Sequence, residues 1–331
     1  MNESATVSAS QANVRVGWER TRWLIRAGMW SLLLAYLFSF FGQRFFVAEL
    51  LANFRTQFLV LLVVAVQLTK FSRTSWLLLI CLLLATAWAG WETGRIYLPA
   101  SQPPAGKTSL RLMSFNVLAT NTEFQAAIEE VRKHDPDVVA VLEYANNWHV
   151  AFDHLNETYP YQHRDPRWHG YGIAIFSKLP LENTESVPLT EEEIDNPAAI
   201  AKFKFGGQTL RLVAVHVMSP INRYRLDLRN RQFEQIATLV NDESTPTILC
   251  GDMNCSPSSR FLSGLIDETA LRDSRQGFGV QPSWPDFAFG FGIPIDHVLV
   301  SESVHVHDRF LGEFGGSDHC PVIVDVSVEQ P

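Results

Sequence analysis

Cysteine is scarce in this sequence. The 331 residues include four cysteines, at positions 81, 250, 255 and 320. Four widely separated cysteines are too few for the disulfide framework of a small secreted domain. None has the paired spacing with cysteine or histidine that a structural zinc site shows. We therefore expect small buried apolar cysteines at 250 and 320, and a disulfide between Cys255 and Cys320 is left open.

Acidic residues are nearly missing from the first 100 residues, which contain 4 of the 35 Asp and Glu and 9 of the 27 Lys and Arg. The rest of the chain then has 31 acidic residues (35 − 4) and 18 basic residues (27 − 9). The formal charges of the two parts are therefore about +5 and about −13. The acidic second part argues against broad nucleic-acid binding, because such binding depends on Lys and Arg displacing counterions from many phosphates. A small phosphorylated substrate is still compatible, because repulsion is screened within about 10 Å at moderate salt.

Long apolar runs are confined to the first part of the chain, at residues 23–41, 58–68 and 76–91. The first and third runs approach the ~20 residues that a bilayer requires. The second is short enough to be a buried helix of a soluble protein, but apolar runs flank it on both sides. We therefore predict a membrane anchor of about three transmembrane helices over residues 23–98. A cleaved signal peptide is the alternative for the first run, although Gln43 and Arg44 follow it where cleavage requires small residues.

Loop charges predict the orientation of this anchor. The N-terminal arm, residues 1–22, is basic, and Arg26 follows it at the start of the first apolar run. The first 13 residues of the arm are expected to be unstructured. Lys70 and Arg73 make the second loop basic too, whereas Glu49 offsets the arginines of the first loop. Basic loops stay in the cytoplasm, so three spans place everything after residue 98 on the periplasmic or extracellular side. Two spans would place it in the cytoplasm.

A Pro-rich linker over residues 99–108 cannot continue a helix, and a globular domain is expected over residues 109–328. Helical patterns in this domain cover 122–133 and 226–240. Short β-type runs alternate with them, at 110–115, 138–142, 172–176, 209–216, 247–250, 297–300 and 322–326. This alternation is typical of sheets covered by helices, and no internal repeat of fixed period is present.

Polar residues come directly after apolar runs that we predict to be strands. They are Asn116, Glu143, His216, Asp252 with Asn254, Asp296, and Asp318 with His319. Strands of one sheet bring their ends to a common rim, so these side chains should converge. Crowded carboxylates repel, and a hard cation relieves the repulsion. We therefore expect Mg²⁺, with Mn²⁺ as the alternative, since no His and Cys cluster favours zinc.

These residues lie in seven ordered segments, SFNVLATN, VAVLEYAN, GYGIAIFSK, VAVHV, ILCGDMNCSPSS, IDHVLVS and GGSDHCPVIVDV. In this order they resemble the motifs of the endonuclease/exonuclease/phosphatase superfamily over about residues 109–328. The resemblance implies an α/β fold, a four-layered sandwich of two packed sheets flanked by helices. It also implies a metal-dependent hydrolase that acts on phosphoester bonds.

The resemblance further implies a role for each matched position. Glu143 matches the metal-binding glutamate, with Asn116 and Asp318 as further contacts to the metal or its waters. Two positions depart from the common pattern: Leu142 precedes Glu143 where many relatives have Gln, and Cys320 follows His319. Neither departure removes a residue type that the chemistry requires.

The implied catalytic residues form a second set. His319 matches the general base or phosphate stabiliser, and Asp296 matches the aspartate that orients it. Asp252 and Asn254 match the pair that positions the attacking water and the phosphate, and His216 faces the phosphate. Arg231 belongs to a run of arginines after His216, which is either a patch that binds the substrate phosphate or a solvated helix start.

An anchor followed by such a domain resembles the VanJ-like membrane members of the superfamily. This resemblance implies a lipid-linked or membrane-proximal phosphorylated substrate, and an isoprenoid pyrophosphate would be the first to test. A membrane-tethered endonuclease or exonuclease acting on DNA or RNA is the first alternative, and a non-catalytic membrane scaffold is the second. Substrate choice should depend on loops such as 144–170 and the Phe-rich 274–294, which is either an apolar rim or core packing.

Overall fold

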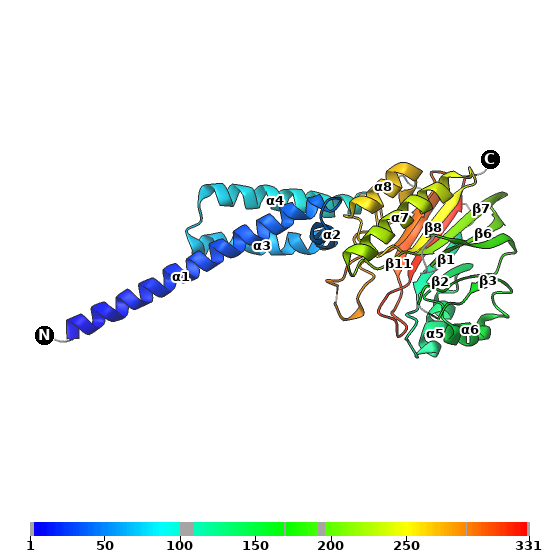
Figure 1. Cartoon of the computed structure of the whole chain (residues 1–331), viewed down its shortest axis with the longest axis horizontal. Coiled ribbons are helices and arrows are strands. Elements are labelled where there is room, and N and C mark those ends of the chain that lie inside the picture. The colour runs from blue at the N-terminus through cyan, green and yellow to red at the C-terminus, as the bar shows by residue number, and fades with distance from the viewer. Residues whose placement is uncertain (1–2, 100–108, 169, 191–195, 289, 330–331) are drawn as a thin grey trace. The chain divides into compact units, whose positions relative to one another are not determined.

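The computed structural model describes residues 3–99, 109–168, 170–190, 196–288 and 290–329. The chain divides into two compact units, Met1–Arg95 and Ile96–Pro331 (Figure 1). The linker that we predict at 99–108 lies outside the described residues except for Pro99. Each unit is described by itself.

The first unit is helical. Its elements are α1 (Glu3–Phe38), η1 (Ser39–Phe41), α2 (Phe46–Ala52), α3 (Arg55–Ser72) and α4 (Trp76–Gly94), and the short η2 (Arg95–Tyr97) follows them. Three helical segments are long and apolar enough to cross a membrane, Arg15–Phe41, Arg55–Ser72 and Trp76–Tyr97. Large apolar side chains also cover the outside of the bundle, including Trp76 and Leu84. Such outward apolar faces are typical of helices that lie in a bilayer.

The N-terminal arm differs from our expectation, because α1 begins at Glu3 and residues 3–13 are helical. The prediction of an unstructured arm was therefore wrong. No proline or glycine interrupts the sequence between Glu3 and Val16. These residues extend a helix that the apolar run already nucleates, so the cost of starting a helix does not recur.

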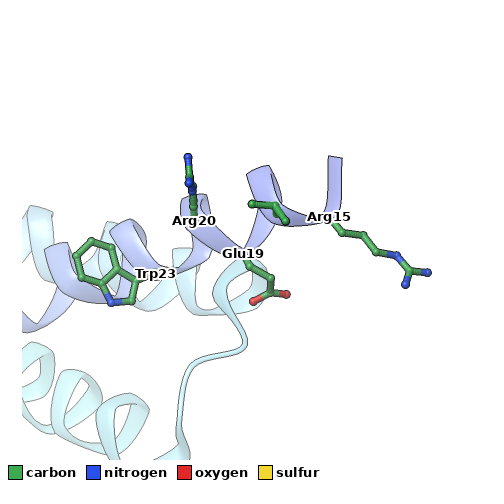
Figure 2. Close-up of a pocket in the computed structure, with 5 residues that line it drawn as sticks. Arg15, Glu19, Arg20 and Trp23 are labelled. Carbon is green, nitrogen blue, oxygen red and sulfur yellow. The ribbon is translucent and has the colours of Figure 1, made fainter. Parts of the chain in front are cut away.

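A shallow hollow of about 450 Å³ lies on the surface of α1. Its lining residues are Arg15, Val16, Glu19, Arg20 and Trp23. Figure 2 shows that all these side chains project from one helix, so the hollow is a groove between neighbouring side chains and not an enclosed site.

The second unit contains two six-stranded mixed sheets. One has the strand order β11-β12-β1-β2-β4-β3, and the other has the order β5-β6-β7-β8-β10-β9. The strands of the first sheet are β1 (Leu110–Asn116), β2 (Val138–Leu142), β3 (Tyr161–Asp165), β4 (Ile173–Ser177), β11 (Val304–Leu311) and β12 (Val322–Val328). Those of the second are β5 (Leu181–Pro188), β6 (Pro197–Phe205), β7 (Gln208–His216), β8 (Thr247–Asp252), β9 (Arg272–Asp273) and β10 (Asp296–Val300).

Helices cover the outer face of each sheet. They are α5 (Phe124–His134), α6 (Asn146–Ala151) with η3 (Phe152–Leu155), α7 (Arg223–Asn241) and α8 (Arg260–Thr269), and a short η4 (Asp286–Ala288) lies in a loop. One apolar core fills the space between the two sheets. A second core joins the first sheet to α5 and α6, and a third joins the other sheet to α7 and α8. The predicted four-layered α/β sandwich is confirmed.

The strands that our prediction omits are mainly the edges. Both edges of each sheet, β3 and β11 in one and β5 and β9 in the other, are missing from the predicted set. Edge strands are half solvated, so their sequences, such as YQHRD in β3, lack the continuous apolar run of a central strand. The central strand β6 and helices α6 and α8 were also not predicted.

All four cysteines are free, and those at 250, 255 and 320 are buried. The expectation for Cys250 and Cys320 is confirmed. The Cys255–Cys320 disulfide that the sequence leaves open is absent.

Candidate active site

The two sheets are built alike around one parallel pair of strands each. In the first sheet β1 pairs with β2 in parallel, and α5 connects them. In the second, β7 pairs with β8 in parallel through α7. Asn116, His216 and Asp252 are the last residues of β1, β7 and β8, and Glu143 directly follows β2. Parallel pairing therefore brings these four side chains to the same end of their sheets.

The other site residues reach this end from antiparallel strands. Asp296 is the first residue of β10 and lies opposite Asp252 in the register. Asp318 and His319 come shortly before β12, which is antiparallel to β1. From the sequence we predicted that every site residue follows a strand. This was wrong for Asp296, Asp318 and His319. They share the rim because the beginning of an antiparallel strand meets the end of its neighbour.

The position of Gly251 requires a glycine directly before Asp252. Its φ is 139°, and a Cβ at this position would overlap the backbone of Val215 on the neighbouring strand. Only glycine allows this close approach. The approach sets Asp252 in register with His216, so the two side chains meet.

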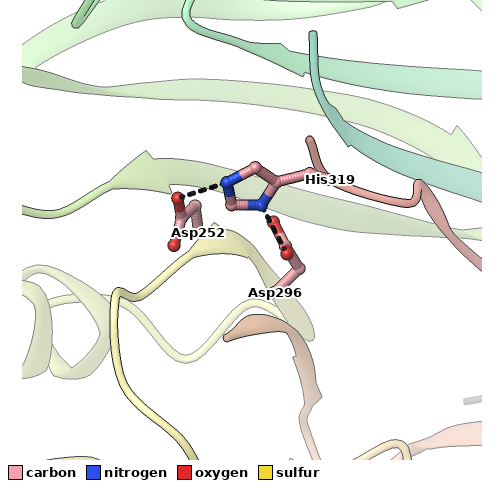
Figure 3. Close-up of side chains that lie close together, drawn as sticks. All are labelled: Asp252, Asp296 and His319. Carbon is pink, nitrogen blue, oxygen red and sulfur yellow. Dashed lines mark hydrogen bonds and ion pairs between the residues drawn. The ribbon is translucent and has the colours of Figure 1, made fainter. Parts of the chain in front are cut away.

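His319 lies between two carboxylates (Figure 3). Its Nδ1 is 2.9 Å from Asp296 Oδ2, and its Nε2 is 3.8 Å from Asp252 Oδ2. The three residues are buried, with exposed fractions of 5%, 1% and 2% for His319, Asp296 and Asp252. Asp252 Oδ2 also lies 3.5 Å from Nε2 of His216, so two imidazoles face one carboxylate.

Burial and mutual charge set the protonation of this cluster. Burial lowers the pKa of His319, but the carboxylates of Asp296 and Asp252 outweigh it and raise this pKa to about 10. Burial, together with the charge of Asp296, raises the pKa of Asp252 to about 6. Burial acts to raise the pKa of Asp296 too, but its ion pair with His319 lowers it overall. An imidazolium at 319 and a carboxylate at 252 that titrates close to neutral pH follow from these shifts.

Asn116 links the two sheets at the rim. Its Nδ2 donates to Glu143 Oε1 at 3.2 Å and to Asp252 Oδ2 at 3.1 Å. The other oxygen of Glu143 accepts from the backbone N–H of Ala119 at 2.9 Å. Glu143 itself has a φ of 57°, an uncommon value for a residue with a side chain. Such backbone strain is often found at functional sites.

Asp318 provides an observation that fits a cation at this rim. Its Oδ2 accepts from Trp284 Nε1 at 2.9 Å. Its Oδ1 is buried, has no hydrogen-bond partner among the described residues, and lies 3.9 Å from His319 Nε2. A buried carboxylate oxygen without a donor is costly unless a cation or ordered water completes it. Carboxylate and amide oxygens, as in Asp318, Glu143 and Asn116, are the hard donors that Mg²⁺ or Mn²⁺ prefers.

Asp252, Asp296 and His319 also meet the distance requirement for a metal site, with one ligand atom of each within 4.8 Å of the others. A cation bound by His319 Nδ1 would break the hydrogen bond to Asp296. The imidazole already supplies the positive charge between these carboxylates. We therefore interpret this group as an ion-pair network, and a cation held by Glu143, Asn116 and Asp318 stays a prediction.

A second group of side chains lies on the His216 side of the rim. The ring of Tyr171 is 5.1 Å from that of His216. Burial raises the pKa of Tyr171, and the guanidinium of Arg225 is close enough to lower it in part. Asn254 has a φ of 48° and donates from Nδ2 to the carbonyl of Val217 at 2.9 Å. Tyr171 and Arg225 were not among the predicted site residues, although GYGIAIFSK already contains the tyrosine.

The arginines of α7 have different environments. Arg229 is fully buried and donates to the carbonyl of Asn254 at 3.2 Å, so it supports the loop after β8. Arg231 is exposed further along the helix. A substrate-binding role for Arg231 stays a prediction.

His297, next to Asp296, faces away from the cluster. It is completely buried, and its Nε2 lies 2.8 Å from the carbonyl oxygen of Cys255. Adjacent strand residues point to opposite faces of a sheet, which explains why two neighbours in the motif have separate surroundings.

Comparison with known proteins decides the family. Residues 113–319, more than half of the chain, match the model of the Endonuclease/Exonuclease/phosphatase family. The chain belongs to this family. Members of the family are phosphoester hydrolases that generally use divalent metal ions, and the resemblance inferred from the motifs is confirmed. A search of curated proteins finds no match.

Solved structures of the family share the fold. D. rerio TDP2 complexed with a single-strand DNA product is 16% identical with a TM-score of 0.56, covering 67% of this chain and 100% of that chain. A family protein from Bacteroides thetaiotaomicron is 20% identical with a TM-score of 0.54, covering 67% and 99%. The human Nocturnin catalytic domain with bound sulfate is 18% identical with a TM-score of 0.53, covering 67% and 95%. At these identities the likeness concerns the fold alone.

Proposed function

We propose that this protein is a divalent-metal-dependent phosphatase or phosphodiesterase that hydrolyses a lipid-linked or membrane-proximal phosphorylated substrate. One observation supports the catalytic part above all. His319 lies between the buried carboxylates of Asp296 and Asp252, and the amide nitrogen of Asn116 joins Asp252 to Glu143. Structural ion pairs rarely gather a cation site, an imidazolium and a near-neutral carboxylate at one rim.

The protonation states suggest separate roles for the cluster. Asp252, with a pKa raised to about 6, is suited to accept a proton from the attacking water near neutral pH. His319 carries its proton under the same conditions, so its Nε2–H would stabilise negative charge on the phosphoryl oxygens. Asp296 holds the imidazole through Nδ1 and favours its charged form.

A bound cation would supply further positive charge to the phosphate. Held by Glu143, Asn116 and Asp318, Mg²⁺ or Mn²⁺ would polarise a phosphoryl oxygen. Trp284 keeps the Asp318 carboxylate in place through its indole N–H. His216 and Asn254 flank Asp252 and would position the phosphate and the water.

The membrane part of the proposal rests on the first unit. Its three long apolar helices and the loop charges favour a multi-pass anchor with the catalytic domain on the periplasmic or extracellular side, as in VanJ-like members. A substrate that carries its phosphate on a lipid, such as an isoprenoid pyrophosphate, is available at such a place. The formal charge of about −13 on residues 101–331 favours this small substrate over a polyanion.

A tethered nuclease is the second candidate, because a neighbour with the same fold, D. rerio TDP2, was solved with a DNA product. The excess of acidic residues in the second part of this chain argues against it. A scaffold without activity is the third candidate, and the complete set of site residues argues against that.

Purified full-length protein in detergent tests these candidates. We expect phosphate release from an isoprenoid pyrophosphate with Mg²⁺ or Mn²⁺, loss of release with chelator, and a decrease of about 10³-fold in His319→Ala. The exposed His154 provides His154→Ala as the matched control, with unchanged activity. Cleavage of single-stranded or duplex DNA with the same dependence would instead establish the nuclease. Hydrolysis of neither substrate would favour the scaffold.

A further inference from the structure

Five large apolar side chains are exposed on three segments of the second unit: the loop after β3, the loop after β7 with the first turn of α7, and the loop before β10. They are Trp168 (85% exposed), Ile221 (68%), Tyr224 (56%), Phe287 (72%) and Phe291 (65%). We call this set the aromatic rim. Water-exposed side chains of this size are usually scattered singly, and a cluster of them marks an interaction surface.

All three loops border the active site. In the loop after β3, a Cβ on Gly170 would lie 3.7 Å from Glu143 Oε2, and the ring of the next residue, Tyr171, lies 5.1 Å from that of His216. The loop after β7 leaves directly from His216. In the third loop, the backbone N–H of Asp286 donates to the carbonyl of Asp318 at 3.2 Å. The aromatic rim therefore belongs to segments that adjoin the candidate active site.

The rest of the second unit exposes few large apolar side chains. Among its described residues the other exposed large apolar side chains are Tyr97, Leu98, Val150 and Tyr161. Tyr97 and Leu98 belong to the segment just before the linker, and the remaining two are single positions on α6 and β3. Exposed apolar area is thus concentrated at the mouth of the site.

Basic side chains accompany the aromatic rim. Arg223 precedes Tyr224 and is exposed, and Arg225 follows Tyr224, whereas Arg167, next to Trp168, is paired with Asp165 at 2.7 Å. Arginines beside aromatic and aliphatic side chains suit the boundary of a bilayer, where headgroup phosphates lie next to acyl chains.

We propose that the aromatic rim inserts into the interfacial layer of a lipid bilayer, so that the active site opens toward phosphates at the headgroup level. A bilayer is the favoured occupant because the same chain contains three helices long and apolar enough to span one. A tethered domain meets that surface at high effective concentration. The inference rests on the proposed membrane location and substrate class, but its first test needs no catalysis.

The first test measures insertion. A fluorophore is attached to Phe287→Cys in a Cys81→Ser background, since the other native cysteines are buried. The matched control is Lys204→Cys, an exposed position at the far end of the same unit's second sheet, paired with Thr209 at the start of β7. The full-length protein is reconstituted in vesicles of anionic and zwitterionic phospholipid with and without spin-labelled lipids. We expect quenching at 287 and none at 204. Equal quenching at both positions, or none at either, would overturn the proposal.

The second test separates insertion from the proposed chemistry. Phe287→Ser/Phe291→Ser should raise the KM for a vesicle-embedded isoprenoid pyrophosphate by about tenfold or more, because the site no longer reaches the headgroup layer. Hydrolysis of a water-soluble phosphoester should be unchanged. An unchanged KM would contradict insertion of the aromatic rim into the bilayer. Absence of any hydrolysis by wild type would contradict the proposed function, and the quenching result alone would then decide whether the rim inserts.

Discussion

At the scale of single residues, neighbouring charges rather than residue type decide the chemistry. Two histidines only 22 positions apart show opposite behaviour. Two carboxylates raise the pKa of His319 to about 10 despite its burial. Burial, with the charge of Arg275, lowers the pKa of His297 to about 4. The first is therefore a cation suited to phosphate binding, and the second is a neutral side chain of the core.

His297 gives a testable consequence for stability. Its Nδ1 is buried without a hydrogen-bond partner among the described residues, so protonation would create a buried charge. The folded pKa of about 4 lies below the ordinary histidine value of 6.5, so the unfolded chain binds the proton more readily. The contribution to stability is complete above about pH 6.5 and is lost as the pH falls toward 4. Between pH 7 and pH 5 the loss should be about 2 kcal/mol.

Urea unfolding of wild type and His297→Gln in detergent at both pH values measures this contribution. Glutamine can keep the hydrogen bond to Cys255 but does not titrate, so the variant should lose less stability than wild type between pH 7 and pH 5. The matched control is His154→Gln at an exposed histidine. The same loss in wild type and His297→Gln would show that His297 is not the responsible group.

Most of the residues that the sequence singles out lie together at the rim of the sheets, but few of their contacts could be predicted. Residue types at motif positions, such as Asp252 and His319, are local information. The bond between Asn116 and Asp252 joins residues 136 positions apart, and that between Trp284 and Asp318 joins residues 34 positions apart. Such contacts depend on how the sheets pack, so Trp284 and Tyr171 could not be assigned from spacing alone.

At the scale of elements, the prediction succeeded for most strands whose burial is continuous, and the central strand β6 is the exception. The central strands β1, β2, β7 and β8 are apolar along most of their length and were found. The edge strands and the short β9 were not, because solvent on one side removes the pattern. The similar construction of the two sheets could not be predicted either. It consists in the order of strands and crossover helices and not in a repeated sequence.

The helical unit contains one polar cluster where the ends of α1, α3 and α4 meet. Arg55 is buried and donates to the carbonyl of Ser39 at 3.0 Å and to Glu92 Oε1 at 3.4 Å. Tyr36 Oη donates to the other oxygen of Glu92 at 3.4 Å. An ion pair within an apolar bundle is costly to break, because removing one partner leaves the other charge without compensation.

We therefore expect Arg55→Met to destabilise the helical unit by about 3 kcal/mol or more. The double variant Arg55→Met/Glu92→Leu should recover part of this loss, because no unpaired carboxylate remains. Thermal unfolding in nanodiscs measures both variants, and Lys70→Met, at an exposed position near the end of α3, is the control. A double variant less stable than Arg55→Met would contradict the ion-pair explanation.

At the scale of the whole molecule, the charge asymmetry predicts which side of the membrane the second unit occupies. Basic residues near the first apolar run and in the loop between α3 and α4 favour the cytoplasm for both segments. An odd number of spans then carries the acidic unit across. An even number would return it to the cytoplasm, where a headgroup of the opposite leaflet would be its substrate.

Cysteine accessibility distinguishes the two arrangements. In the Cys81→Ser background, Lys204→Cys reports on the second unit and Arg73→Cys on the loop between α3 and α4. An impermeant maleimide added to intact spheroplasts should label position 204 at once and position 73 only after permeabilisation. Labelling of position 73 alone would mean either that all three helices span in the reverse orientation or that α1 and α4 cross while α3 does not. Protection of both positions would mean that α1 and α3 cross while α4 does not, because the loop and the second unit would then both be cytoplasmic. In either case the isoprenoid pyrophosphate proposal would have to move to a substrate of the cytoplasmic leaflet.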